Sequence, residues 1–248
     1  MYSKAEEWVL TPGDLHLWWA RLDWPQSVAD SFMPLLSPAE RERAGRFAFA
    51  GDGNRYRVAH GVLRRLLGKY LQVRPAAIGF ETFPLGKPVL AEPFARHGIA
   101  FNLSHCRDLA LFGFALNRAV GVDVERVREV PEMKGIVARY FSASEQAALA
   151  NCAETERRRR FFRCWVLKEA LAKAEGVGLG RGSAGLDRVD DGSVSQLLTL
   201  RDDRTGICQP GTAFHLQPGP DWAAAAVVAG RDMVVTERCW CFLDKPCQ

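Results

Sequence analysis

The sequence has no uninterrupted apolar run approaching the ~18 residues that a membrane-spanning helix needs. Its first residues also lack the basic segment and apolar stretch of a secretory signal, so we expect a cytoplasmic protein. The seven cysteines are odd in number and have no framework spacing, which favours reduced, mostly buried thiols. Cys239 and Cys241 lie near Cys247 in the sequence, but without a second C-x-x-C pair or a nearby histidine they argue against a zinc site.

The composition is that of an ordinary folded protein. Of the 248 residues, 48% are hydrophobic and 25% are charged, which excludes a disordered chain, a collagen-like repeat and a coiled-coil rod. At ~100–200 residues per domain, the length favours one large domain or two small ones.

The net charge is small but unevenly distributed along the chain. The 33 basic and 29 acidic residues leave a formal charge of +4. Residues 41–69 alone hold eight lysines and arginines against Glu42 and Asp52, a local excess of six positive charges. This concentration favours an anionic partner, and the alternative interpretation is a solvated helix face.

Helix signals in the first half follow a recognisable order. Ser37, followed by a proline and by Glu40, forms a capping-box pattern that predicts a helix to about residue 47. After a break expected at the glycines of 51–53, an apolar stripe predicts a second helix over 54–71.

The second half repeats this order. Ser142 and Glu145 form another capping-box pattern that predicts a helix to about residue 153, and a longer helix is expected over 156–174. Short strands are expected at 78–83, 100–103, 109–116, 120–124, 196–200, 214–216 and 222–228. The sequence therefore predicts an α+β fold made of two similar subdomains, an N-terminal one over 1–118 and a C-terminal one over 119–248.

The G-V-D-V-E segment at 121–125 places two carboxylates on one face of a strand. Residues i and i+2 of a strand point to the same side, so Asp123 and Glu125 project together. Such a pair repels unless it is protonated or bound to a cation, and a hard ion such as Mg²⁺ takes oxygen ligands. The alternative is a strand end with two solvated acids.

A second motif, W-V-L-K-E-A-L-A-K at 165–173, lies within the expected long helix. Trp165, Glu169 and Lys173 share one helix face, which offers a third carboxylate for a metal beside a lysine for a phosphate. An exposed Glu169–Lys173 ion pair worth ~0.3–0.5 kcal/mol is the alternative. The arginine run at 157–160 just upstream suits a nucleic-acid contact or a solvated helix start.

Two further segments carry groups that suit an anion. In the N-L-S-H segment at 102–105, a hydroxyl and an imidazole are expected at a strand exit. In Gly86-Lys87-Pro88, glycine permits close backbone approach and proline stiffens the turn that carries the lysine. The spacing of a P-loop is absent, and an ordinary turn is the alternative for each segment.

The order of these motifs resembles the 4′-phosphopantetheinyl transferase superfamily, of the larger Sfp type. The family patterns G-[IV]-D-[IV]-E and [FW]-x-x-[KC]-E-[AS]-x-x-K are both intact, and the segments 37–47 and 85–90 also fit. The resemblance extends from about Ser37 to Gly180. It implies the family fold, a pseudo-twofold pair of α+β subdomains with the active site in the cleft between them, and a monomer.

The resemblance also implies an activity and its partners. The family transfers the 4′-phosphopantetheine arm of coenzyme A to a serine of an apo acyl or peptidyl carrier protein, and releases adenosine 3′,5′-bisphosphate. Coenzyme A is then the co-substrate and Mg²⁺ the expected metal, with Mn²⁺ as an alternative. The expected partners are apo carrier proteins of fatty-acid, polyketide or non-ribosomal-peptide biosynthesis, with neither nucleic acid nor membrane.

The family's site residues map onto positions of this chain. Asp123, Glu125 and Glu169 are the implied metal ligands. Asp123, Glu169 and Lys173 are the implied catalytic residues, with Glu169 as a base for the carrier serine and Lys173 on a phosphate oxygen. Glu145 matches a further family acid that would assist the base. The implied coenzyme A-binding residues are Arg43, Arg46, Gly86, Lys87, Pro88, Asn102, Ser104, His105, Asp123, Glu169 and Lys173.

The chain departs from the family at two positions. Glu40 stands where some members have lysine, and Tyr56 stands where some have a small hydroxyl residue. The loop after Arg126, with Val127, Val130 and Met133, is a candidate docking surface for a carrier protein, and ordinary packing is the alternative.

Two other function classes compete with the transferase interpretation. Clustered carboxylates with a lysine also build metal-dependent nuclease sites, although here Lys168 directly precedes Glu169 on a helix, unlike the spacing in those enzymes. The other alternative is a non-catalytic module that binds coenzyme A or a carrier protein, which would not require Asp123, Glu169 and Lys173 to be present together.

Overall fold

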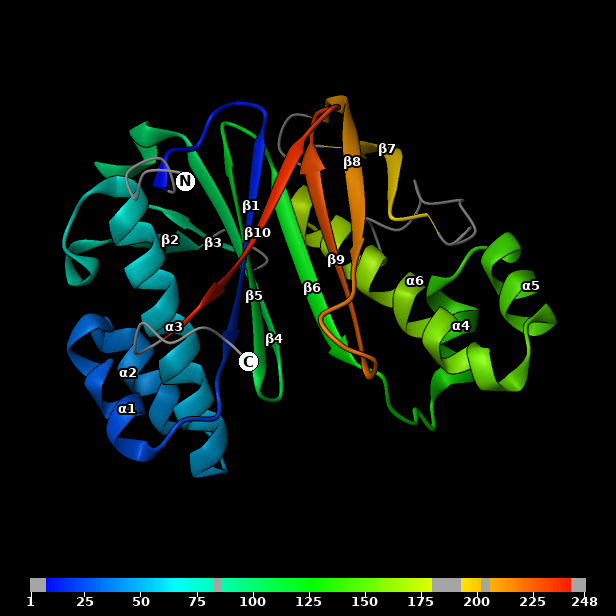
Figure 1. Ribbon diagram of the computed structural model, residues 1–248, viewed down its shortest axis with the longest axis horizontal. Helices are drawn as coiled ribbons and strands as arrows, with labels where there is room; N and C mark the ends of the chain where they lie inside the picture. Colours follow the sequence, from blue (N-terminus) through cyan, green and yellow to red (C-terminus); the bar gives the residue numbers. More distant parts are fainter. Residues whose placement is uncertain (1–7, 83–85, 180–192, 202–205, 242–248) are drawn as a thin grey trace. The chain divides into compact units, whose positions relative to one another are not determined.

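The computed structural model contains two compact units (Figure 1). It describes residues 8–82, 86–179, 193–201 and 206–241. The first unit holds the described residues of Met1–Thr82, Pro88–Asn117 and Val234–Gln248, and the second holds those of Phe83–Lys87 and Arg118–Met233. Each unit combines a four-stranded sheet with a long helix, so the predicted α+β class with two sheet-and-helix halves is confirmed.

The main sheet of the first unit has the strand order β10-β1-β5-β4. β1 pairs antiparallel with β5 and parallel with β10, and β4 pairs antiparallel with β5. The elements of this unit are β1 (Asp14–Arg21), α1 (Gln26–Ser31), η2 (Met33–Leu35), α2 (Pro38–Gly45), α3 (Ala50–Leu71), η3 (Pro75–Ala77), β2 (Phe80–Thr82), β3 (Pro88–Leu90), η4 (Phe94–His97), β4 (Ile99–Cys106), β5 (Leu109–Leu116) and β10 (Val234–Trp240).

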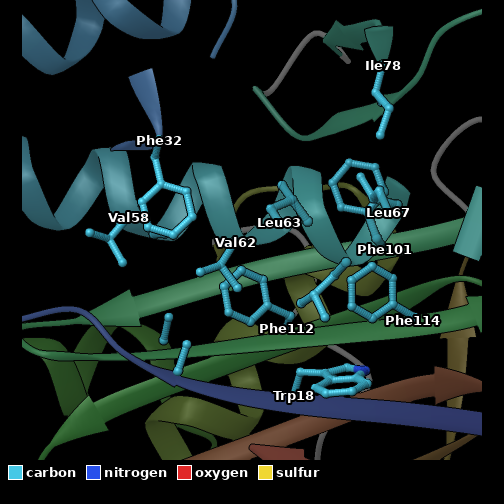
Figure 2. Packing of buried hydrophobic residues seen from close by; sticks show 14 of the residues in the cluster. Trp18, Phe32, Val58, Val62, Leu63, Leu67, Ile78, Phe101, Phe112 and Phe114 are labelled. Atoms are coloured by element: carbon cyan, nitrogen blue, oxygen red, sulfur yellow. The ribbon is translucent and has the colours of Figure 1, made fainter. Parts of the chain in front are cut away.

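The core of this unit lies between α3 and one face of its sheet (Figure 2). Val62 and Leu63 of α3 lie above Phe112 of β5 and Trp18 of β1, and all four are nearly inaccessible to solvent. Large apolar side chains on both sides exclude water from this layer, which favours the docked helix at about 25 cal/mol for each Å² of apolar surface buried.

The start of α3 differs from the prediction. A helix break was expected at residues 51–53, but α3 begins at Ala50 and includes both glycines. A Cβ atom on Gly53 would lie 2.7 Å from the carbonyl oxygen of Ala44 in α2. Glycine is therefore needed here for the close approach of the two helices, and a position in the first turn tolerates it.

A buried ion pair joins α2 to α3. The Ser37–Glu40 capping box is present as predicted, and the same Glu40 carboxylate lies 2.8 Å from the guanidinium of Arg64, whose side chain is 2% exposed. Arg64 also donates to the carbonyl oxygen of Ile78. Burial alone would raise the pKa of Glu40, but hydrogen bonds from His60 and the Ser37 main chain, together with Arg64, lower it to about 2.

The second unit has the strand order β6-β9-β8-β7, with all neighbours antiparallel. α6 packs on β6 and β9, and its aromatic residues Phe161 and Phe162 are buried against the sheet. The elements are β6 (Val120–Arg126), α4 (Met133–Tyr140), α5 (Ala143–Asn151), α6 (Glu154–Glu175), β7 (Ser195–Arg201), β8 (Cys208–Leu216) and β9 (Trp222–Ala229).

Most predicted helices and strands are present, within a few residues. Three strands were not predicted: the three-residue β3, which follows a predicted turn, and the longer β1 and β10. Six of the eight residues of β1 are buried, so its apolar run shows no alternation, whereas β10 mixes apolar and charged residues at exposed edge positions. They pair with each other, and the Trp19 indole donates to Glu237 across the pair at 2.9 Å.

The division of the sequence at residue 118 stays a prediction. In the structure, β10 (Val234–Trp240) belongs to the first unit, and Lys87 belongs to the second. Both lie across the predicted boundary. The predicted glycine-rich exit after α6 begins at Gly176, which has a positive φ of 76° as the helix C-cap, and its residues 180–182 lie outside the described part of the chain.

We expect the Glu40–Arg64 pair to make stability depend on acid pH. A carboxyl whose pKa is lowered on folding stabilises the protein above its unfolded value of about 4.5, and this contribution is lost as pH falls toward 2. Denaturant unfolding of wild type and Glu40→Gln at pH 6 should therefore differ by up to about 3 kcal/mol, and the difference should shrink toward pH 2.

Glu42 provides the matched control for this test. It forms an exposed ion pair with Arg46 one turn along α2, so Glu42→Gln should cost well under about 1 kcal/mol. Equal pH profiles for the Glu40 and Glu42 variants would contradict the assignment of the acid dependence to the buried pair.

Candidate active site

The approach of α6 to β6 determines where the predicted carboxylates lie. Gly121 begins the G-V-D-V-E segment, and a Cβ atom there would lie 2.0 Å from the carbonyl oxygen of Ala170 and 2.4 Å from the amide nitrogen of Ala174. Only glycine leaves room for the helix backbone at this distance. Asp123 and Glu125 are on the same strand face as Gly121, because they follow it at intervals of two.

Asp123 and Lys173 form the central ion pair of this site. Lys173 Nζ lies 2.6 Å from Asp123 Oδ1, and the two side chains are 29% and 5% exposed. The pair joins β6 to the last turn of α6. The two motifs that the sequence singled out separately are therefore brought together, and both lie in the second unit.

Glu169 lies near the same charges. Burial raises the pKa of its carboxyl, and the negative charge on Asp123 raises it further, while Lys173 lowers it and Glu125 adds a smaller increase. A raised pKa makes a carboxylate a better proton acceptor near neutral pH. The structure thus concentrates three acids and one lysine around the contact between β6 and α6.

The donor chemistry of these acids suits a hard divalent cation. Carboxylate oxygens are preferred ligands of Mg²⁺, and a cation would offset both the burial and the repulsion from Asp123 that raise the pKa of Glu169. Within the described residues, no group of three or more His, Cys, Asp or Glu side chains is arranged to hold a metal ion. A divalent ion on Asp123 would compete with Lys173 for the same carboxylate.

Lys87 binds main-chain carbonyl groups of both elements that form this site. Its Nζ donates to the carbonyl oxygen of Lys173 at 2.6 Å and to that of Val120 at 2.9 Å. The carbonyl of Lys173 belongs to the last turn of α6, where no intrahelical donor is left, so Lys87 acts as a side-chain cap. Burial lowers the pKa of Lys87 to about 8.

The predicted nucleotide-binding residues of β4 do not share one surface. Asn102 and Ser104 are buried and share a face of the strand, whereas His105 is exposed. The sequence placed Ser104 and His105 together at a strand exit, but β4 continues to Cys106 and Ser104 pairs with Leu111. Neighbouring residues in a strand point to opposite faces, so this part of the prediction is corrected.

The predicted arginines of α2 have different surroundings. The guanidinium of Arg43 lies 5.6 Å from the ring centroid of Tyr56, which stacks on His60 at 4.0 Å. Arg46 forms an exposed ion pair with Glu42. Gly86 has a positive φ of 90°, as expected for the turn before Lys87, and Pro88 begins β3.

Comparisons with known proteins agree with this set of motifs. A family model described as the 4′-phosphopantetheinyl transferase superfamily matches residues 119–227, and one described as 4′-phosphopantetheinyl transferase, N-terminal, matches residues 24–113. The chain is 35% identical over 230 residues to 4′-phosphopantetheinyl transferase HetI of Nostoc sp., with 92% of each chain covered. The chain belongs to the 4′-phosphopantetheinyl transferase superfamily.

Two further relatives support the Sfp-like type. The chain is 29% identical over 203 residues to 4′-phosphopantetheinyl transferase Sfp of Bacillus subtilis, covering 81% of this chain and 86% of the relative. It is 30% identical over 192 residues to the human L-aminoadipate-semialdehyde dehydrogenase-phosphopantetheinyl transferase, covering 73% and 62%. The resemblance noted in the sequence is confirmed, and the protein is an enzyme of the phosphopantetheinyl transferase type.

Glu145 has a structural role in this transferase. Its carboxylate accepts from the Ser142 amide at 2.7 Å and lies 2.9 Å from Nζ of Lys168, and both charged side chains are almost fully buried. The pair joins α5 to α6 directly beside Glu169. We therefore assign Glu145 to holding the two helices together, rather than to assisting a base.

The basic stretch at 41–69 is partly neutralised by acids from distant parts of the sequence. Arg55 pairs with Asp23 at 2.6 Å, and Arg57 lies 3.4 Å from Asp30. Together with the Glu40–Arg64 pair, these contacts neutralise three of the six excess positive charges. Its attraction for an anionic partner is therefore weaker than the sequence predicted.

The candidate docking loop after Arg126 packs against its own unit. Val127, Val130 and Met133 are partly buried against the core of the second unit, which favours the ordinary-packing alternative.

Among the described residues, none of the helices is both long and apolar enough to cross a membrane.

The contribution of Lys87 to stability should depend on alkaline pH. Between pH 8 and 10.5 the native amine is neutral and still has two N–H groups for its two carbonyls, whereas the unfolded lysine stays charged. The unfolded state then binds more protons, so stability rises with pH in this window, by at most about 3 kcal/mol.

Unfolding of wild type and Lys87→Met in guanidinium chloride at pH 7.5 and pH 10 tests this. Wild type should gain stability relative to the variant at the higher pH. Lys69→Met, which changes an exposed lysine at the end of α3, supplies the baseline for other titrating groups. A constant difference between wild type and Lys87→Met across the window would contradict a buried amine.

Proposed function

We propose that this transferase moves the 4′-phosphopantetheine arm of coenzyme A to a serine of apo acyl or peptidyl carrier proteins in a reaction that depends on Mg²⁺. The observation that supports it most is the Asp123–Lys173 pair with Glu169 beside it, in a chain of this family. The released product is adenosine 3′,5′-bisphosphate, and the site works within one chain.

Phosphoryl transfer is mainly a matter of position and charge. The substrate diphosphate and the transition state carry negative charge, which cations must offset. A bound Mg²⁺, or Mn²⁺ in its place, would supply a compact charge on the diphosphate oxygens. Asp123, Glu125 and Glu169 are the residues proposed to hold it.

Lys173 and Glu169 are given distinct tasks. Lys173 holds its ammonium at Asp123, and in the proposed complex it neutralises an oxygen of the diphosphate. Glu169 accepts the proton of the carrier serine, directly or through water, and its raised pKa suits this task. A carboxylate that ligates a metal is a poorer base, so Asp123 and Glu125 carry the greater part of metal binding in this proposal.

The remaining predicted residues are proposed for binding coenzyme A. Arg43 and His105 are assigned to the 3′-phosphate region, and Arg46, Gly86, Pro88, Asn102 and Ser104 to the nucleotide and its surroundings. Lys87 contributes through the backbone it holds, because its ammonium already bonds two carbonyl oxygens.

Removal of either acid should abolish transfer. We expect Asp123→Ala and Glu169→Ala to lower the rate of arm transfer by at least about 100-fold, because each removes charge or proton acceptance at the reacting centre. The rate is measured by mass spectrometry, as the gain in mass of an apo carrier protein incubated with the enzyme, coenzyme A and Mg²⁺. A panel of apo carriers identifies the preferred substrate.

The exposed acid Glu129 serves as the control for these variants. Glu129 is 85% exposed and pairs with Arg158, eleven residues before Glu169 in α6, so Glu129→Ala should retain transfer within about two-fold. Wild type that modifies no carrier serine, or Asp123→Ala with full activity, would contradict the proposal. A plasmid-degradation assay with the same preparations tests the nuclease alternative, for which we expect no cleavage.

Metal removal gives an independent test. Dialysis against EDTA should abolish transfer, and Mg²⁺ or Mn²⁺ should restore it, because the substrate phosphates need a divalent charge for reaction. Thermal unfolding should change little on removal of the metal, since Lys173 already pairs with Asp123. Full activity after exhaustive chelation would remove the metal from the proposed reaction.

A further inference from the structure

The four arginines at the start of α6 divide into two groups. Arg157 pairs with Glu154, and Arg158 lies 3.3 Å from a carboxylate oxygen of Glu129. Arg159 and Arg160 have no carboxylate within 4.0 Å among the described residues, although Arg160 Nη1 donates to a carbonyl oxygen of α5 at 3.4 Å. Half of the arginine run is therefore neutralised and half is not.

The arginines without acidic partners line a cavity of about 380 Å³ in the second unit. Arg163, one helical turn beyond Arg159, adds a third guanidinium to the wall. The strands contribute Trp222 at the start of β9 and Leu216 at the end of β8 to the same lining.

Glu156, the acid in the lining of this cavity, does not neutralise Arg159 or Arg160. Glu156 also lines the cavity, and its spacing of three and four residues to Arg159 and Arg160 favours an ion pair on a helix. Even so, Glu156 has no basic partner within 4.0 Å in the part of the chain that the structure describes. Arg159 and Arg160 therefore outnumber Glu156 in the lining, which favours an anion from outside.

This cavity is separate from the carboxylate–lysine cluster. Glu169 follows Arg163 by six residues, which on an α-helix is about 9 Å along the axis and about 120° around it. None of the cavity's lining residues belongs to the proposed active site. The residues that would contact a ligand here do not include Asp123, Glu169 or Lys173.

We propose that the cavity binds a phosphorylated small molecule with a planar ring, such as a nucleoside monophosphate. Guanidinium groups bind phosphate oxygens in a bidentate manner, and the indole of Trp222 offers an apolar surface for the ring. The volume is within the range of small-ligand pockets, about 300–1,000 Å³. This site goes beyond the transfer reaction and does not depend on it.

The test follows the indole N–H signal of Trp222 by NMR, assigned with Trp222→Phe, while AMP or inorganic phosphate is added to the full chain. We expect AMP to shift this signal with a Kd below about 1 mM, and phosphate to bind more weakly. Arg159→Gln should weaken AMP binding at least about tenfold, because it removes a guanidinium from the wall. Arg158→Gln, which changes the neighbouring paired arginine, should keep the wild-type Kd within about two-fold.

Asp123→Ala separates this site from the active site. It should lose carrier modification yet keep the AMP-dependent shift of Trp222, so failure of either proposal is visible without the other. A Trp222 signal that stays unmoved at about 10 mM AMP would overturn the inference, as would unchanged binding by a folded Arg159→Gln. A glutamate-rich peptide that shifts Trp222 where AMP does not would assign the cavity to a protein partner instead, and would also overturn it.

Discussion

The candidate active site depends on one close approach between a helix and a strand. α6 can lie against β6 only because Gly121 has no side chain, and at this distance Lys173 reaches Asp123 at 2.6 Å. The neighbouring strand β9 also has small residues here, such as Ala225 beside Asp123, and their short side chains leave room for α6 on this face of the sheet. Lys87 then caps the carbonyl of Lys173, so the end of the helix is held by a side chain as well as by packing.

The two units use the same device at corresponding places. In each, the acid of a capping box closes the start of a short helix and also pairs with a buried cation on the following long helix. Glu40 pairs with Arg64 in the first unit, and Glu145 pairs with Lys168 in the second. Both long helices contain 22 residues. The halves are therefore similar in their ionic contacts, where their sequences show little similarity.

The sequence predicted best what is encoded locally. Capping boxes depend on side chains three residues apart, and the active-site motifs depend on spacing within one strand or one helix, so α2, α5 and the β6–α6 cluster could be found. Contacts between distant segments could not be predicted from the sequence. The pairing of Arg55 with Asp23 joins residues 32 apart, and Lys87 binds main-chain carbonyls that carry no sequence signature. Strands β1 and β10 were missed because their pairing, and not an alternating pattern, defines them.

The parallel pairing of β1 with β10 has a consequence for synthesis of the chain. Asp14 of β1 is synthesised 220 residues before Val234, its partner in β10 (Val234–Trp240). Until β10 emerges, one edge of β1 has exposed N–H and C=O groups that can pair with other chains. The first unit thus cannot complete its sheet until β10 has been synthesised, and a nascent chain arrested before residue 234 would expose an unpaired strand edge that favours aggregation.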